Sequence, residues 1–193
     1  AELTQKYTGN DFRKRNLIKR ARSGLAGIAE AKKEWSTAAK YLKPLVDANP
    51  ADANVATRLA RAVFNQDTNV GDNQGQETDA AKILAALYKS NPTKVLRPEI
   101  TLAQMYQVAG ELDRSASLMK SASVKDEQGL ATQLTVARWA LRTGDLPLAE
   151  QCSNRALQIE SGSMDARLVA GLTARYKKDY KRARQILEAA HLQ

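Results

Sequence analysis

Residues 128–163 read QGLATQLTVARWALRTGDLPLAEQCSNRALQIESGS. Apolar side chains in the first half of this stretch recur at close to a helical period: Leu130, Leu134, Ala137 and Leu141. This spacing predicts a helix over residues 128–143, which Gly144 and Asp145 end as a turn. A second amphipathic helix is expected over residues 146–159, so the stretch predicts one helical hairpin.

Small residues recur along the chain at the places that Ala137 and Ala149 hold in this hairpin. In the expected first helices they are Ala26, Ala60, Ala103, Ala137 and Gly171, and in the second helices Ala38, Ala80, Ser115, Ala149 and Ala183. The steps are 34, 43, 34 and 34 residues in the first set, and 42, 35, 34 and 34 in the second. Small side chains at fixed places let two backbones approach closely, so the period predicts stacked helical hairpins in an all-α solenoid.

The repeat organises the chain into a capping segment and an array. The N-terminal capping segment covers residues 1–18 and is expected to be helical from about residue 11. The array covers residues 19–193 in five units: 19–52, 53–95, 96–129, 130–163 and 164–193. Their helices are expected at 11–33 and 35–48, 52–65 and 78–90, 98–109 and 112–122, 128–143 and 146–159, and 164–177 and 180–190. A polar, glycine-containing insert at residues 66–77 lengthens the second unit and predicts a mobile loop.

Bulk composition limits the class of protein. No stretch approaches the roughly 18 apolar residues of a membrane span. The chain begins at Ala1 without methionine, which predicts a mature form or an excised fragment and leaves the localisation open. The formal net charge of +9 favours acidic partners, namely acidic peptides, nucleic acid or anionic lipid. A basic surface that merely aids solubility explains the same charge.

The sequence offers no constellation that predicts catalysis, a metal site or a cofactor. His191 is the single histidine, which excludes a histidine-dependent triad and a multi-histidine metal site within this chain. Cys152 is the single cysteine, and we expect it to be a small buried or half-buried side chain. Asp72 stands where a calcium-binding loop needs its turn glycine, so the insert is interpreted as a plain loop. We therefore predict that the chain is not an enzyme.

The repeat resembles the tetratricopeptide family, over residues 19 to 193. The family has large apolar residues at repeat positions seven and twenty-four. Most residues match at position seven (Leu25, Leu59, Leu102, Val136, Ala170) and at position twenty-four (Leu42, Leu84, Met119, Ser153, Leu187). Pro50 and Pro92 match the terminal proline of that family, and Gly110-Glu111 and Gly144-Asp145 match its turn. The chain departs at position four, where the common tryptophan is replaced by Arg22, Ala56, Glu99, Gln133 and Arg167. The nearest rivals are other helical-hairpin solenoids, including the pentatricopeptide type.

The resemblance implies a right-handed superhelix whose first helices line a concave groove that binds a peptide or a partner helix. Members of the family are mostly adaptors or scaffolds and rarely enzymes. Transferring the groove positions by register gives a candidate site of arginines and apolar neighbours: Arg58, Arg61, Phe64, Arg97, Ile100, Gln104, Leu134, Arg138, Leu141, Arg142 and Arg175. Because guanidinium groups bind carboxylates and phosphates in a forked geometry, this track predicts an acidic ligand. The alternative is that some arginines pair with acids of adjacent helices.

The two ends of the array carry features of their own. A basic cluster near the N-terminus is interleaved with Phe12, Leu17 and Ile18, and consists of Arg13, Lys14, Arg15, Lys19, Arg20 and Arg22. It suits nucleic acid or a membrane surface, but a solvated capping helix is the interpretation we favour. At the other end Leu187, Ala190 and Leu192 have no following helix to cover them, which predicts truncation, a partner subunit or self-association.

Three functions compete on this sequence. The leading hypothesis is a non-enzymatic interaction module that binds a protein or peptide segment in its groove. The second is a basic nucleic-acid-binding repeat, although the residues at position five carry no base-reading pattern. The third is a structural subunit of a larger assembly that associates through its uncovered C-terminal face.

Overall fold

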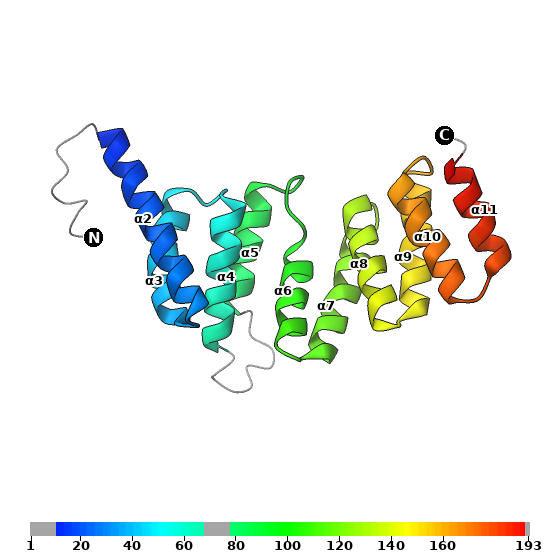
Figure 1. The fold of residues 1–193 in the computed structure, drawn as a ribbon, viewed down its shortest axis with the longest axis horizontal. Coiled ribbons are helices and arrows are strands. Elements are labelled where there is room, and N and C mark those ends of the chain that lie inside the picture. Colours follow the sequence, from blue (N-terminus) through cyan, green and yellow to red (C-terminus); the bar gives the residue numbers. More distant parts are fainter. Residues whose placement is uncertain (1–10, 68–77, 192–193) are drawn as a thin grey trace. The chain divides into compact units, whose positions relative to one another are not determined.

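The computed structural model describes residues 11–67 and 78–191, and within them the backbone forms ten α-helices and no strand (Figure 1). The all-α helical-repeat class predicted from the sequence is confirmed. The chain divides into two compact units, residues 1–98 and 99–193. The predicted insert at 66–77 lies almost wholly outside the described residues, since helix α4 continues to Asp67.

The N-terminal unit contains four helices that pack in chain order. They are α2 (Asp11–Ala31), α3 (Trp35–Ala48), α4 (Ala53–Asp67) and α5 (Asp79–Ser90). Each helix packs against the next one along the chain. Two of the predicted small residues, Ala26 of α2 and Ala38 of α3, are 0% exposed and lie in one core with Leu42 and Leu59. Their lack of bulk lets α2 and α3 approach closely, as the repeat predicted.

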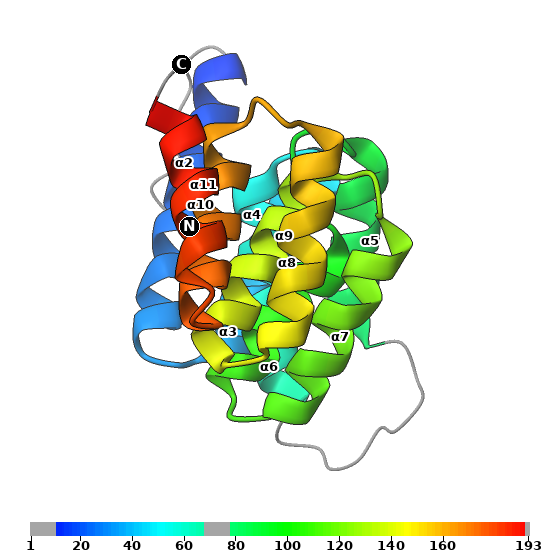
Figure 2. The ribbon, with the colours of Figure 1, turned by 90° about the vertical axis from the view of Figure 1, so that its right-hand side faces the viewer.

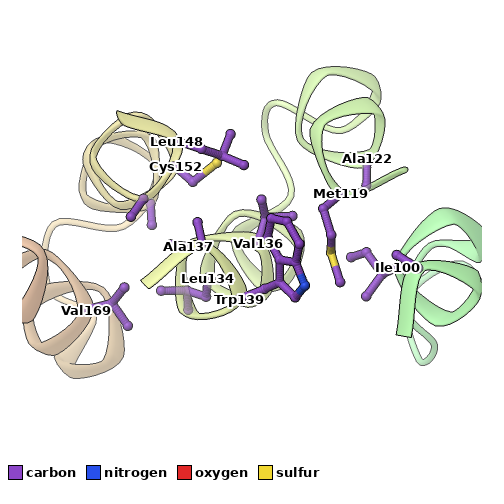
Figure 3. Packing of buried hydrophobic residues seen from close by; sticks show 14 of the residues in the cluster. Ile100, Met119, Ala122, Leu134, Val136, Ala137, Trp139, Leu148, Cys152 and Val169 are labelled. Atoms are coloured by element: carbon purple, nitrogen blue, oxygen red, sulfur yellow. The ribbon is translucent and has the colours of Figure 1, made fainter. Parts of the chain in front are cut away.

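The C-terminal unit holds the remaining helices and the larger core. They are α6 (Pro98–Val108), α7 (Leu112–Lys125), α8 (Leu130–Thr143), α9 (Leu146–Ile159), α10 (Met164–Tyr176) and α11 (Tyr180–His191). Helix α9 lies against both α8 and α10, and α8 also touches α10 (Figure 2). Figure 3 shows the core around Val136, Ala137 and Trp139 of α8, with Met119 of α7 on one side and Val169 of α10 on another.

Side-chain caps explain where several helices begin. The side chains of Thr78, Asp145 and Ser163 each accept a hydrogen bond from a backbone N–H in the first turn of α5, α9 and α10. These N–H groups have no partner within their own helix, so the caps stabilise the starts. The predicted helix ends agree with the structure to within a few residues. The largest difference is in α7, which continues to Lys125, three residues beyond the predicted end at Ala122.

The turns inside four hairpins share a left-handed backbone at one residue. Gly110 and Gly144 adopt φ angles of 85° and 83°, as expected for glycine at a helix end. The equivalent turns of the first and last hairpins place lysines there, with φ of 59° at Lys33 and 64° at Lys178. In all four turns the residue after the left-handed one is acidic. The left-handed φ is also kept in the two turns that have lysine instead of glycine.

Two polar side chains, Gln133 and Arg167, connect their helices to the segment that precedes each helix. Gln133 of α8 is 0% exposed, and its Nε2 donates to the backbone carbonyls of Ser123 at 2.8 Å and Asp126 at 2.9 Å. Arg167 of α10 similarly donates from Nε to the carbonyl of Ser161 at 2.9 Å. Both side chains satisfy carbonyls just past the preceding helix or in its last turn, where a helix leaves them unpaired.

Candidate binding surfaces

Arg58 of α4 is tied to α2 by five hydrogen bonds. Its Nε lies 3.0 and 3.1 Å from the two carboxylate oxygens of Glu30, and its Nη2 lies 2.9 Å from Oε2. The same guanidinium donates to the hydroxyl of Ser23 at 3.0 Å and to its backbone carbonyl at 3.2 Å. Only 21% of the Arg58 side chain and 25% of the Glu30 side chain are exposed. Arg58 therefore links two neighbouring helices, with its charge balanced by Glu30.

The other candidate residues of the N-terminal unit differ in exposure. Arg61 is exposed, whereas Phe64 is only 4% exposed and packs in the interior. Arg97 is half-buried, and its guanidinium carbon lies 5.3 Å from the centre of the Tyr88 ring. Of the three predicted arginines in this unit, Arg58, Arg61 and Arg97, only Arg61 is thus exposed.

Two apolar candidates of the C-terminal unit are core residues. Ile100 is 0% exposed and Leu134 is 6% exposed, and both belong to the cluster around Val136 (Figure 3). Leu141 is half-buried against the same cluster, and Gln104 is exposed on α6. Buried side chains shape the scaffold and do not meet a ligand, so Ile100 and Leu134 act here through packing.

Three exposed arginines lie on the adjacent faces of α8 and α10. Arg138 is exposed, and its Nη2 forms a 3.1 Å ion pair with Asp165 of α10. Arg142 follows one turn later on α8 and forms no ion pair with any residue that the structure describes. Arg175, exposed near the end of α10, lies 5.6 Å from the ring centre of Tyr176. The ion pair shows that Asp165 lies on the side of α10 nearest to α8, and Arg175 lies ten residues later, about 80° away from Asp165 around the helix axis.

Exposed apolar side chains accompany these arginines. Leu168 is 46% exposed and Tyr176 is 54% exposed, and both share the Asp165 face of α10. We call Arg138, Leu141, Arg142, Leu168, Arg175 and Tyr176 the α8–α10 surface. Leu168 and Tyr176 were not part of the predicted site, and the signal for them was their spacing of three and eleven residues from Asp165, which places all three on one helix face.

The remaining charged contacts near α11 are structural. Glu150 of α9 pairs with Lys177 and, at 3.3 Å, with Arg182 of α11. Arg182 also donates from Nη2 to Asn154 at 2.8 Å, so α11 is held to α9 by polar contacts. Leu187 of α11 is 36% exposed. The side chains of Ala190 and Leu192, which the sequence predicts to be uncovered, lie outside the described side chains.

Groups that could perform chemistry are sparse in the described part of the chain. No three histidine, cysteine, aspartate or glutamate side chains are grouped to hold a metal ion in residues 11–67 and 78–191. Cys152 is 0% exposed, and burial raises the pKa of its thiol above the ordinary cysteine value. A buried thiol with a raised pKa is a poor nucleophile, which agrees with its predicted role as a small core side chain. None of the described helices is long and apolar enough to cross a membrane.

Comparison with known proteins gives structural neighbours at low identity. No family model and no curated protein matches the chain. The crystal structure of MamA protein is 14% identical with a TM-score of 0.49, and the match covers 90% of this chain and 90% of that one. MamA 41-end from Desulfovibrio magneticus RS-1 is 10% identical with a TM-score of 0.49, covering 90% of this chain and 93% of that one. At these identities and scores we transfer neither a function nor site residues to this chain.

Proposed function

We propose that this protein binds a segment of another protein, rich in acidic residues, on the α8–α10 surface. The observation that carries the proposal is the placement of Arg138, Arg142 and Arg175 beside exposed Leu168 and Tyr176 on two neighbouring helices. Arginine supplies forked hydrogen bonds to carboxylates, while leucine and tyrosine supply contact area. Such a mixture suits a peptide in which acidic and apolar side chains alternate along one face.

The Arg138–Asp165 pair refines this proposal. Its two side chains are 50% and 62% exposed, so solvent screens the pair and it is weakly held. An incoming carboxylate can replace Asp165 as the partner of Arg138 at little cost. Arg142 has no ion-pair partner among the described residues and offers its donors directly. Arg142 and Arg175 should therefore contribute most to binding.

We also propose that the ten helices are five tetratricopeptide-like repeats. The proposal is supported by the predicted helix pairs, by burial of Ala26, Ala103 and Ala137 at the repeated small positions, and by the left-handed turn residue in four hairpins. On that assignment α6, α8 and α10 are first helices, and the α8–α10 surface belongs to the side that would line a groove.

Selection from a random peptide display library tests the binding proposal. We expect the chain to enrich peptides in which aspartate or glutamate is interspersed with apolar residues. The double variant Arg142→Gln/Arg175→Gln should raise the Kd of a selected peptide by about 100-fold, because each of the two charge-assisted contacts contributes on the order of 1.4 kcal/mol, or about tenfold.

The matched control removes the same charge from the N-terminal unit. Lys89 and Lys94 are exposed and form no ion pair with any described residue, so Lys89→Gln/Lys94→Gln should leave the Kd within about twofold. Enrichment of peptides without acidic residues would overturn the proposal. Equal loss of affinity in both double variants would also overturn it, since net charge and not this surface would then be responsible.

A further inference from the structure

The first four turns of α2 stand apart from the hydrophobic core. No residue between Asp11 and Leu25 is buried, whereas Ala26 and Ala29 further along are 0% and 2% exposed. Helix α2 has 21 residues and its partner α3 has 14, so α2 is longer by about 10 Å at 1.5 Å per residue. Figure 1 shows the N-terminal end of α2 continuing past α3. Packing therefore does not explain why this stretch is helical and rich in cations.

One face of this stretch is occupied by α4 and its start. Lys19 pairs with Asp52 at 3.3 Å, and Ser23 and Glu30 both contact Arg58. Residues four and seven apart share a helix face, so these three contacts define the side that points toward α4. On the opposite side lie Leu17, which is 43% exposed, and Ile28, which is 56% exposed. The outer face of α2 is thus open to solvent.

Two pairs of arginines flank that outer face. Arg13 and Arg20 are seven residues apart and form one ridge, and Arg15 and Arg22 form a second. Residues two apart on a helix point about 200° away from each other, so the ridges run along opposite sides of the helix. All four side chains are exposed, and none forms an ion pair with a described residue. The first buried residue of α2 on the second side is Ala26, which lies beyond Arg22.

We propose that these four arginines bind the phosphate backbone of duplex DNA, with the outer face of α2 lying along the major groove. An α-helix with its side chains is about 10–12 Å across, and the major groove of B-DNA is about 12 Å wide. Cations on both sides of the helix then face the two phosphate strands that border the groove. A membrane surface fits less well, because an interfacial helix needs its apolar and basic residues on separate faces, and Lys14 lies between Leu17 and Ile18 on the helical wheel. This site is in the N-terminal unit and is independent of the α8–α10 surface.

The test measures binding of the full-length chain to a fluorescent DNA duplex by anisotropy over a salt series. If four phosphates are neutralised, log K should fall against log salt with a slope of about −3.6, or about 100-fold between 50 and 200 mM salt. The variant Arg13→Gln/Arg15→Gln/Arg20→Gln/Arg22→Gln should lose most of the affinity and of the slope. Gln is nearly as good a helix former as Arg, so the circular dichroism of the variant should not change.

A charge-matched control and two other ligands make the outcome decisive. Four exposed lysines without an ion-pair partner among the described residues give the control Lys40→Gln/Lys89→Gln/Lys94→Gln/Lys181→Gln, which should bind DNA nearly as well as the unaltered chain. Duplex RNA of the same sequence should bind more weakly, because its major groove is too narrow for a helix. No DNA binding at low salt, equal loss in the control, equal binding of duplex RNA, or tighter binding to vesicles containing phosphatidylserine would each overturn the proposal.

Discussion

At the scale of single residues, burial determines the chemistry of Cys152. Burial raises the pKa of its thiol, which a hydrogen bond with Ser123 and the charge of Arg155 only partly oppose. A group whose pKa is raised by folding stabilises the fold at every pH below its unfolded-state pKa, which is about 8.5 for cysteine. This stabilisation is lost as the pH rises through the pKa of the folded state. The thiol of Cys152 therefore stabilises the fold at neutral pH, and this stabilisation is lost in alkali.

Comparison with Cys152→Ala tests this pH dependence. The variant should be less stable at pH 7 because it leaves a small cavity. The difference in the free energy of unfolding between the two chains should shrink as the pH rises above about 8.5, since only the unaltered chain has a thiol to ionise. Urea titrations at several pH values measure this difference. A difference that grows with pH would contradict the burial of an un-ionised thiol.

Ala137 marks a close approach between helices. Its side chain is 0% exposed in the core of the C-terminal unit. We expect Ala137→Leu to lower the free energy of unfolding by about 1–3 kcal/mol, because a packed core accepts extra methylenes only with strain. Ala131 is exposed on the same helix, and Ala131→Leu should change stability by no more than about 0.5 kcal/mol. Equal effects of the two substitutions would show that position 137 is not crowded.

The exposure of individual candidate residues was only partly predictable from the sequence. Ile100 and Leu134 were predicted to line the groove, yet both are buried, whereas Leu168, which was not in the predicted site, is 46% exposed. Leu134 is buried because it lies in one core with Val169 of α10. Likewise, Glu30 of α2 and Arg58 of α4 form an ion pair between two helices, which repeat register alone does not reveal.

At the scale of elements, helix period and breakers predicted nearly every boundary. The spans of α3 and α9 agree with their predicted ranges, because apolar periodicity and end signals coincide there. The end of α7 was placed too early, since nothing in its sequence revealed that Gln133 would hydrogen-bond the carbonyls of Ser123 and Asp126. That contact comes from the next helix and is tertiary in origin.

The Gln133 contact gives an element-scale prediction. Replacing it by leucine removes both donated hydrogen bonds, and leaves the Ser123 carbonyl with a 3.4 Å contact from Arg155 and the Asp126 carbonyl with a 3.2 Å bond from the N–H of Gly129. We expect Gln133→Leu to lower the free energy of unfolding by about 2 kcal/mol. Gln128 is exposed, and Gln128→Leu serves as the control with an expected change of no more than about 0.5 kcal/mol. Unchanged stability of Gln133→Leu would mean that the last turn of α7 does not depend on this cap.

The turn residues give a second prediction at this scale. Lys178 adopts a left-handed φ of 64°, which costs an L-residue about 1 kcal/mol and costs glycine nothing. Lys178→Gly should therefore stabilise the chain by about 0.5–1 kcal/mol, while Gly144→Ala at φ 83° should destabilise it by about 1 kcal/mol. Thermal unfolding of the two variants would show opposite shifts in Tm. Shifts of the same sign would contradict the turn geometry.

At the scale of the whole molecule, the net charge of +9 is concentrated differently in the two units. In the N-terminal unit four exposed arginines without an ion-pair partner among the described residues, Arg13, Arg15, Arg20 and Arg22, lie on the first turns of α2, and a fifth, Arg61, lies on α4. In the C-terminal unit Arg138, Arg142 and Arg175 are interleaved with apolar side chains. The arginines of α2 and those of the α8–α10 surface are therefore proposed to bind different ligands. Substitutions in one unit should leave ligand binding by the other unit unchanged.

Hydrogen–deuterium exchange of the full chain, with and without a saturating acidic peptide from the display selection, tests the central claim most directly. Binding on the α8–α10 surface predicts slower amide exchange in residues 130–143 and 164–176, because a bound peptide stabilises these helices against local opening. Exchange elsewhere should change little. Protection confined to α2 or to α11, with α8 and α10 unchanged, would contradict the account and move the protein-binding site to an end of the chain.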